Sequence, residues 1–171
     1  MKETSNNNPI RIEAFAGKET VVIESIVFRC KRKIDWPGVE QYLKRFIGNE
    51  YVLGKSKEKV RIGSDFPDEY ANSSYTKSIH GTTAKAKANA AQAIPLLIQS
   101  AEQAVFRENL KDKHKSDANE GWYYCVVRFT LPVMNDSGVI IGTNCFRGRM
   151  ILRKNDGKLY LYDIIDIKKG T

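Results

Sequence analysis

Three consecutive segments between Trp122 and Lys169 constrain the fold most, because each alternates between apolar and polar side chains. This alternation is the period of a β-strand with one buried face. The sequences that join the segments, "MNDSG" at 134–138 and "NDG" at 155–157, contain residues that tolerate the positive φ of hairpin turns. The pattern therefore predicts a three-stranded antiparallel meander, with Pro132 and Gly142 limiting its regular part.

Each strand of this meander should have one apolar and one polar face, since successive side chains point to opposite sides. The predicted core face holds Tyr123, Cys125, Val127, Phe129, Phe146, Met150, Leu152, Leu159, Leu161, Ile165 and Ile167, with Asp163 as a polar exception. The predicted outer face holds Trp122, Tyr124, Val126, Arg128, Arg147, Arg149, Ile151, Arg153, Tyr160, Tyr162, Ile164, Asp166 and Lys168.

The outer face has the chemistry of a nucleic-acid surface. Guanidinium groups bind phosphate oxygens in a bidentate way, and aromatic rings stack on unpaired bases. Single-stranded or looped RNA fits such a face better than a duplex groove. An ordinary solvated sheet face is the alternative, although few acidic residues are present to balance the arginines. The nucleic-acid candidates are Arg128, Arg147, Arg149, Arg153, Lys168, Tyr124, Tyr160 and Tyr162.

The rest of the chain predicts helices and a hairpin. Residues 10–15 and 20–29 alternate loosely around "GKET", which indicates a β-hairpin. Asp35 and Pro37 can start a helix that ends near Gly48. The segment 59–67 suggests a short strand closed by the turn "SDFPDEY", and 68–81 reads as an irregular loop. An alanine-rich helix should run from 81 to 110, kinked or split at Pro95.

These elements predict an α+β fold in which helices pack on one face of the meander. We expect residues 1–9 to be a disordered lead-in, residues 10–34 to be an N-terminal hairpin extension, and residues 35–171 to form the main domain.

Composition narrows the classes of function. Lysine and arginine number 28 against 20 acidic residues, and the net charge of +8 favours an acidic partner such as RNA. No stretch reaches 18 apolar residues and no signal peptide is present, so no membrane association is expected. Three cysteines without ligand spacing favour a reducing, cytoplasmic location. Without zinc-binding, P-loop or Rossmann patterns, we expect neither a metal nor a cofactor.

Two histidines could move protons near neutral pH. His80 precedes the alanine-rich helix, whose N-terminus could hold an anion. His114 lies in the charged connector "KDKHK". Lys85 and Lys87 of the alanine-rich helix point away from its apolar stripe. Lys85 and His80 join the nucleic-acid-binding candidates, and Lys87 joins the catalytic ones. A solvated role is the alternative for each histidine.

Residues 35–169 resemble domains that phages and mobile elements carry, often within large polyvalent proteins. The resemblance is carried by "IGSDFPDEY", "AKAKANAAQAI", "KHK" followed by "GWYY", "RFTLPV" and "GKLYLYDIIDIKK". That family is similar to the barnase/EndoU/colicin/RelE-like ribonuclease folds. The resemblance implies helices on one side of a meander and an active site on its open face. It also implies metal-independent RNA cleavage, in which the 2′-hydroxyl attacks the adjacent phosphorus and leaves a cyclic phosphate. The residues that match its pattern are Arg128, Arg153, Lys85, Lys87 and His114.

Three hypotheses follow from the sequence. The first is an endoribonuclease, a toxin or phage effector, in which Arg128 and Arg153 hold the phosphate while His114 or Lys87 moves protons. The second is a non-catalytic module that binds nucleic acid on the same face. The third is an adaptor of a mobile element whose hairpin docks a partner protein, such as an immunity or phage protein.

Overall fold

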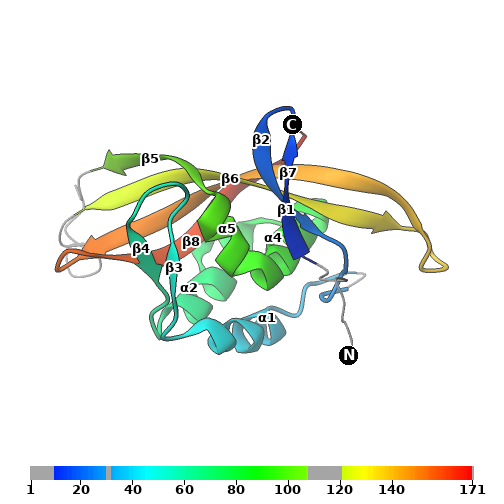
Figure 1. Ribbon diagram of the computed structural model, residues 1–171. Coiled ribbons are helices and arrows are strands. Elements are labelled where there is room, and N and C mark those ends of the chain that lie inside the picture. The colour runs from blue at the N-terminus through cyan, green and yellow to red at the C-terminus, as the bar shows by residue number, and fades with distance from the viewer. Residues whose placement is uncertain (1–9, 30–31, 108–120, 171) are drawn as a thin grey trace, which may run out of the picture.

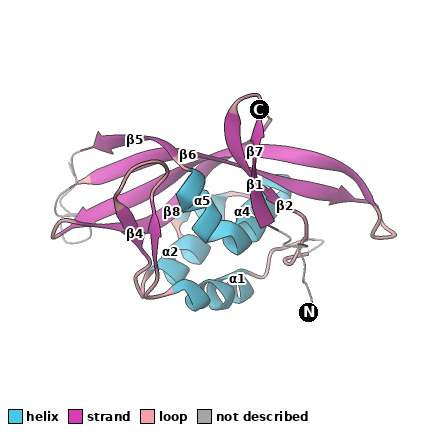
Figure 2. Ribbon diagram, in the orientation of Figure 1, coloured by secondary structure: helices cyan, strands magenta, loops and turns pink. Residues whose placement is uncertain are grey.

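One curved β-sheet lies over a layer of helices in the computed structural model, which describes residues 10–29, 32–107 and 121–170 (Figures 1 and 2). The α+β class predicted from the sequence is confirmed. The expected lead-in at residues 1–9 and His114 lie outside the described residues.

Within the described residues the sheet has eight strands. Seven are bonded in the order β1-β2-β6-β7-β8-β4-β3, and β5 pairs with the outer edge of β6 beside β2. The strands are β1 Ile10–Phe15, β2 Lys18–Ile23, β3 Glu50–Val52, β4 Lys59–Arg61, β5 Glu102–Arg107, β6 Trp122–Met134, β7 Ile140–Asn155 and β8 Lys158–Lys169.

The strands β6, β7 and β8 form the antiparallel meander expected from the alternating segments. Its two turns use the predicted residues, since Gly138, Asp156 and Gly157 have φ values of 82°, 53° and 76°. Both hairpins therefore depend on residue types that tolerate the left-handed region.

The helices are short and lie on one side of the sheet (Figure 1). They are α1 Trp36–Leu43, α2 Phe66–Asn72, α3 Ser74–Ser78, α4 Gly81–Ala90 and α5 Ile94–Ser100, with 3₁₀ turns at Lys44–Phe46 and Ala91–Ala93. The expected cap of α1 is present, because the Asp35 side chain accepts a hydrogen bond of 3.1 Å from the Gly38 N–H. Pro95 lies in the first turn of α5, where the predicted long helix is split.

Two predictions about the middle of the chain were wrong. Residues 68–81 are not a loop but contain most of α2 and all of α3, because Phe66 and Tyr70 anchor α2 in the core and Ser73 caps α3. The alanine-rich helix does not reach residue 110, since residues 102–107 form β5. Pairing with the edge of β6 offers this segment backbone hydrogen bonds that overcome its helical pattern.

The N-terminal hairpin is part of the main sheet and core. Strand β2 pairs in parallel with β6 through Val21 with Phe129 and Val22 with Thr130. Val21 and Ile23 are fully buried in the common core. The expected boundary between residues 34 and 35 therefore does not divide the core, because β2 completes the sheet that the helices cover.

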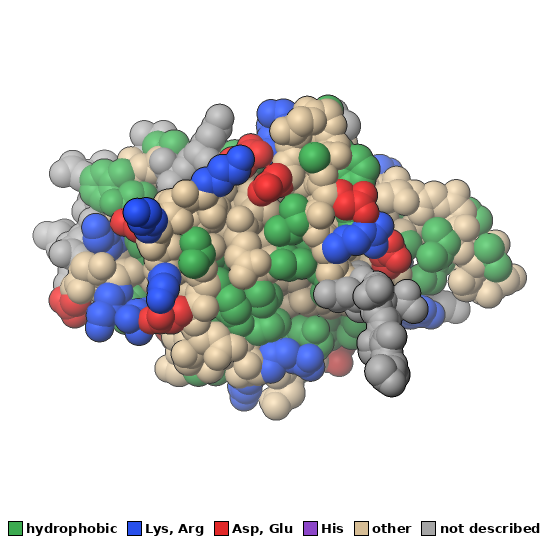
Figure 3. Space-filling view, viewed as in Figure 1, with side chains coloured by type: hydrophobic (Ala, Val, Ile, Leu, Met, Phe, Trp, Pro, Cys, Tyr) green, Lys and Arg blue, Asp and Glu red, His purple; other side chains and the backbone are tan. Residues whose placement is uncertain are grey.

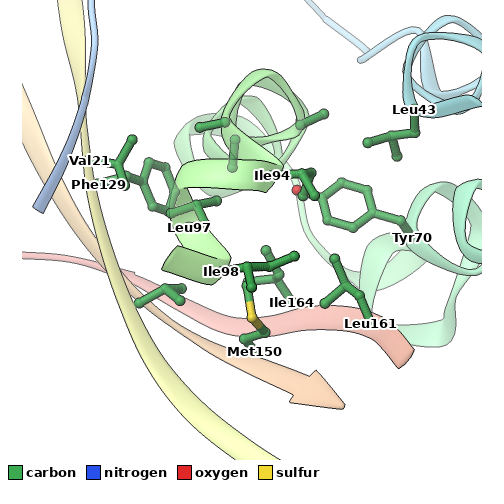
Figure 4. Close-up of a cluster of buried hydrophobic side chains, with 14 of the residues drawn as sticks. Val21, Leu43, Tyr70, Ile94, Leu97, Ile98, Phe129, Met150, Leu161 and Ile164 are labelled. Carbon is green, nitrogen blue, oxygen red and sulfur yellow. The ribbon is translucent and has the colours of Figure 1, made fainter. Parts of the chain in front are cut away.

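The core fills the space between the helices and the meander (Figure 4). Leu97 and Ile98 of α5 lie against Phe129 of β6 and Met150 of β7, and Tyr70 of α2 lies on the side of α1. All five belong to one cluster of buried hydrophobic residues. Among the described residues, none of the helices has the length and apolar character that crossing a lipid bilayer requires.

One strand departs from simple alternation. Ile164 of β8 is fully buried and Ile165 is only partly buried, the reverse of the prediction. Leu152 pairs with Leu161 while Ile151 pairs with Asp163, so β8 holds an extra residue at this point. Such a bulge shifts the following side chains to the other face. A second register shift, between the pairs Arg149–Ile165 and Arg147–Lys168, restores the predicted faces of Ile167 and Lys168.

Asn89 of α4 attaches the segment after β2 to the helical layer. Its buried side chain accepts hydrogen bonds from the N–H groups of Val27 at 2.8 Å and Phe28 at 3.0 Å. It also donates to the carbonyl of Phe28 at 3.1 Å. This amide therefore satisfies backbone groups that have left the sheet.

We expect Asn89→Ala to lower the free energy of unfolding by about 2–4 kcal/mol, because it leaves part-buried backbone groups unpaired. Urea denaturation followed by circular dichroism measures the change. The control is Asn72→Ala, whose exposed amide bonds Glu40 and Asp68 and should cost less than about 1 kcal/mol. Equal losses in the two variants would contradict this role of Asn89.

Candidate nucleic-acid interface

The polar side chains of the meander lie on the face opposite to the helices, which we call the open face. Phe146, Met150 and Leu152 of β7 are buried beneath it, whereas Arg147 and Arg149 between them are exposed. The open face consists of Trp122, Tyr124, Val126, Arg128, Arg147, Arg149, Ile151, Arg153, Tyr160, Tyr162, Ile165 and Lys168.

The register of the meander brings three basic residues into one row across the open face. Arg128 of β6 pairs with Arg147 of β7, which pairs in turn with Lys168 of β8. Because neighbouring strands lie about 4.8 Å apart, the three side chains start within roughly 10 Å of one another. We call these residues the basic row. Like charges held this close favour an anion between them.

Only one member of the basic row has an acidic partner in the described part of the chain. Arg128 Nη1 lies 2.8 Å from Oε1 of Glu102 on β5, and the Arg128 side chain is 16% exposed. Arg147 and Lys168 are exposed, and no ion pair involves either of them among the described residues. These two cations are therefore accessible to an external anion.

The other two arginines of the open face are held by carboxylates. Arg149 lies 3.5 Å from the carboxylate of Asp166. Arg153 lies 2.9 Å from Asp65, which directly precedes α2, and its side chain is only 12% exposed. Asp65 and the surrounding protein therefore hold the guanidinium of Arg153 in one position.

The expected shortage of acidic residues near these arginines is thus only partly correct. Glu102 and Asp65 come from outside the meander, and the sequence placed Glu102 in a helix and Asp65 in a turn. Residues 102–107 read EQAVFR and do not alternate between polar and apolar side chains, so the local pattern does not indicate a strand that borders the meander.

Some parts of the surface away from the open face have paired charges. On the side seen in Figure 3, basic and acidic side chains lie next to one another. Arg61 lies 2.7 Å from Glu50, and Arg11 is bonded to Glu13 and Glu24. The basic row differs from this pattern because its neighbours in register are also basic.

The tyrosines of the open face contact protein groups. The guanidinium of Arg149 lies 5.6 Å from the ring centre of Tyr124, and that of Arg153 lies 5.3 Å from the ring centre of Tyr160. Tyr162 packs edge-on against Trp122, with ring centres 4.9 Å apart. Two of these rings therefore hold arginines in place, and base stacking by them stays a prediction.

Lys87 is not on the open face and cannot contact RNA there. It is fully buried, and its Nζ lies 2.6 Å from Oδ1 of Asp163 and 2.7 Å from Oγ1 of Thr76. Burial lowers the pKa of Lys87 and raises the pKa of Asp163, and their mutual attraction opposes both shifts. The expected catalytic role is wrong in its geometry, because the lysine points from α4 into the core.

The carboxyl of Glu69 on α2 lies beside this pair and is half-buried. Burial, and after it the negative charge of Asp163, raises the pKa of Glu69, while a hydrogen bond with Tyr162 lowers it. Glu69 thus connects the buried ion pair to Tyr162, and α2 reaches the edge of the meander at this ring.

His80 and Lys85 also lie away from the open face. His80 is the N-cap residue of α4, and Lys85 follows in the same helix, which packs on the helical side of the sheet. The structure therefore separates these two residues from the arginines with which the sequence grouped them.

Among the described residues, no group of three or more histidine, cysteine, aspartate or glutamate side chains could hold a metal ion. The amino-acid sequence matches no family model and no curated protein, and the fold matches no solved structure.

We expect Lys87→Met to lower the free energy of unfolding by about 3–5 kcal/mol, because it leaves the buried Asp163 carboxylate without its cationic partner. The double variant Lys87→Met/Asp163→Leu should recover most of this loss, since it removes both buried charges. Thermal and urea denaturation of wild type, both single variants and the double variant measure the coupling. Additive losses would contradict a buried ion pair.

Proposed function

We propose that the chain binds single-stranded or looped RNA on the open face of the meander. The observation that carries this proposal is the basic row, in which Arg128, Arg147 and Lys168 occupy neighbouring positions on three strands. Phosphate groups would occupy the space beside Arg147 and Lys168, neither of which forms an ion pair with a carboxylate among the described residues.

The arrangement favours contact with the RNA backbone over recognition of particular bases. Guanidinium and ammonium groups bind phosphate oxygens, and such contacts carry no sequence information. Tyr124 and Tyr160 are partly exposed beside arginines, so an unpaired base could extend these stacks. Weak sequence preference and strong dependence on salt follow from this chemistry.

We expect Arg147→Ala/Lys168→Ala to weaken RNA binding at least tenfold. Anisotropy of a fluorescent single-stranded RNA of about 12 nucleotides measures the affinity. Each lost contact should also reduce the slope of log affinity against log salt by roughly 0.7. The matched control is Lys44→Ala/Arg45→Ala, which removes the same number of charges from the 3₁₀ turn that follows α1.

Equal losses in the two double variants would show that only net charge matters and would reject the open face as the binding site. Binding of double-stranded RNA as tightly as single-stranded RNA would reject the preference for unpaired strands.

RNA cleavage is a second proposal, and the ion pair between Arg128 and Glu102 favours it. A carboxylate 2.8 Å from a guanidinium on the open face could accept the proton of a 2′-hydroxyl. The 2′-oxygen would bond to phosphorus as the bond to the 5′-oxygen breaks, which leaves a cyclic phosphate, and a water molecule would protonate the departing 5′-oxygen. Arg128 would offset the charge that develops on the phosphate. Arg153 could not reach the same group, because it pairs with Trp122, which lies six residues from Arg128 along β6 and therefore about 20 Å away.

If the chain cleaves RNA, we expect Glu102→Gln to reduce the rate at least a hundredfold and leave RNA binding measurable. The assay is incubation of RNA in EDTA, with analysis of the new ends for cyclic phosphate. Glu58→Gln, in the exposed turn before β4, is the control. Intact RNA with the wild-type chain would reject cleavage and leave the binding proposal standing.

A further inference from the structure

A second basic region surrounds a cleft on the helical side of the molecule. The cleft encloses about 890 Å³ between the segment 32–37, which leads into α1, and residues 76–85 of α3 and α4. This volume lies within the range of small-molecule sites. The cleft is separate from the open face, because α4 packs on the other side of the sheet.

Positive charge dominates the lining of this cleft. Four cationic side chains line it, together with His80 and the single carboxylate of Asp35. That carboxylate is occupied in capping α1 through the Gly38 N–H. The cations are Arg32, Lys33, Lys77 and Lys85.

One wall of the same cleft is apolar. It is formed by Ile34, Trp36 and Ile79, all of which are partly exposed. The indole of Trp36 offers a flat surface on which an aromatic ring can stack. The cleft therefore combines a surface for a planar ring with cations for a negative group.

The first turn of α4 adds donors to the charged part. No acidic residue occurs in that turn, and the His80 side chain makes no capping hydrogen bond. The N–H groups of the turn can therefore bind an oxygen anion alongside the lysines.

We propose that this cleft binds a nucleoside phosphate. The phosphate contacts Lys77, Lys85 and His80, and the base lies against Trp36. A free nucleotide and the phosphorylated end of an RNA strand present the same chemistry, so either can occupy the cleft. Binding here does not depend on the open face.

Isothermal titration calorimetry with adenosine 5′-monophosphate tests the proposal. We expect saturable binding that is at least tenfold tighter than binding of inorganic phosphate or of adenosine, because each lacks one half of the contacts. Lys77→Ala/Lys85→Ala should weaken binding of the nucleotide at least tenfold. The matched control, Lys55→Ala/Lys57→Ala in the turn between β3 and β4, should leave it unchanged.

Two further variants locate the ligand. Trp36→Leu keeps an apolar side chain, so it should weaken binding of the nucleotide but not of inorganic phosphate. The Arg147→Ala/Lys168→Ala variant should bind the nucleotide as tightly as wild type. Binding in the cleft can therefore be distinguished from binding of RNA on the open face. In that background, tighter binding of a 5′-phosphorylated oligonucleotide than of its 5′-hydroxyl form would assign the cleft to strand ends. Equal binding would assign it to free nucleotides.

Absence of saturable nucleotide binding would overturn the proposal. Equal losses in the two lysine pairs would do the same, since they would indicate general charge attraction. If a short polyglutamate peptide bound more tightly than the nucleotide, the ligand of the cleft would be an acidic peptide rather than a nucleoside phosphate.

Discussion

The antiparallel register of β6, β7 and β8 determines both surfaces of the meander. The backbone pairing that places Phe129 beside Phe146 under the helices also places Arg128 beside Arg147 on the other side. A shift of one residue would exchange the two sets, exposing the core and burying the arginines. The apolar face keeps the register in place, because moving it into water would cost far more than the repulsion between neighbouring cations. The basic row is thus a consequence of core packing.

The buried pair of Lys87 and Asp163 connects the helical layer to this meander at the bulge of β8. The bulge turns Asp163 toward α4, and Thr76 and the ring of Tyr70 surround the lysine. An ion pair at this depth contributes little net stability, but loss of one partner is costly. We interpret the pair as a device that sets the position of α4 relative to β8.

The molecule carries two basic regions on opposite sides of the sheet, and they differ in shape. The open face is a broad surface on which arginines are held by carboxylates and tyrosine rings. The cleft beside α4 is a hollow of about 890 Å³ with a single indole in its wall. A surface suits an extended polyanion, whereas a cleft suits one small ligand. Both proposed ligands are phosphates, in agreement with the excess of basic residues.

The sequence by itself determined the meander, the α+β class and most of the open face, because alternation and turn residues act over a few neighbouring positions. It could not determine the strand at 102–107, whose local pattern is helical and whose hydrogen bonds come from β6. For the same reason Glu102 and Asp65 were missed as partners of Arg128 and Arg153, which lie 26 and 88 residues away. Only the tertiary structure decided that Lys87 is buried while Lys85 lines a cleft, since a helix turns by about 100° per residue and its neighbours choose which side is covered.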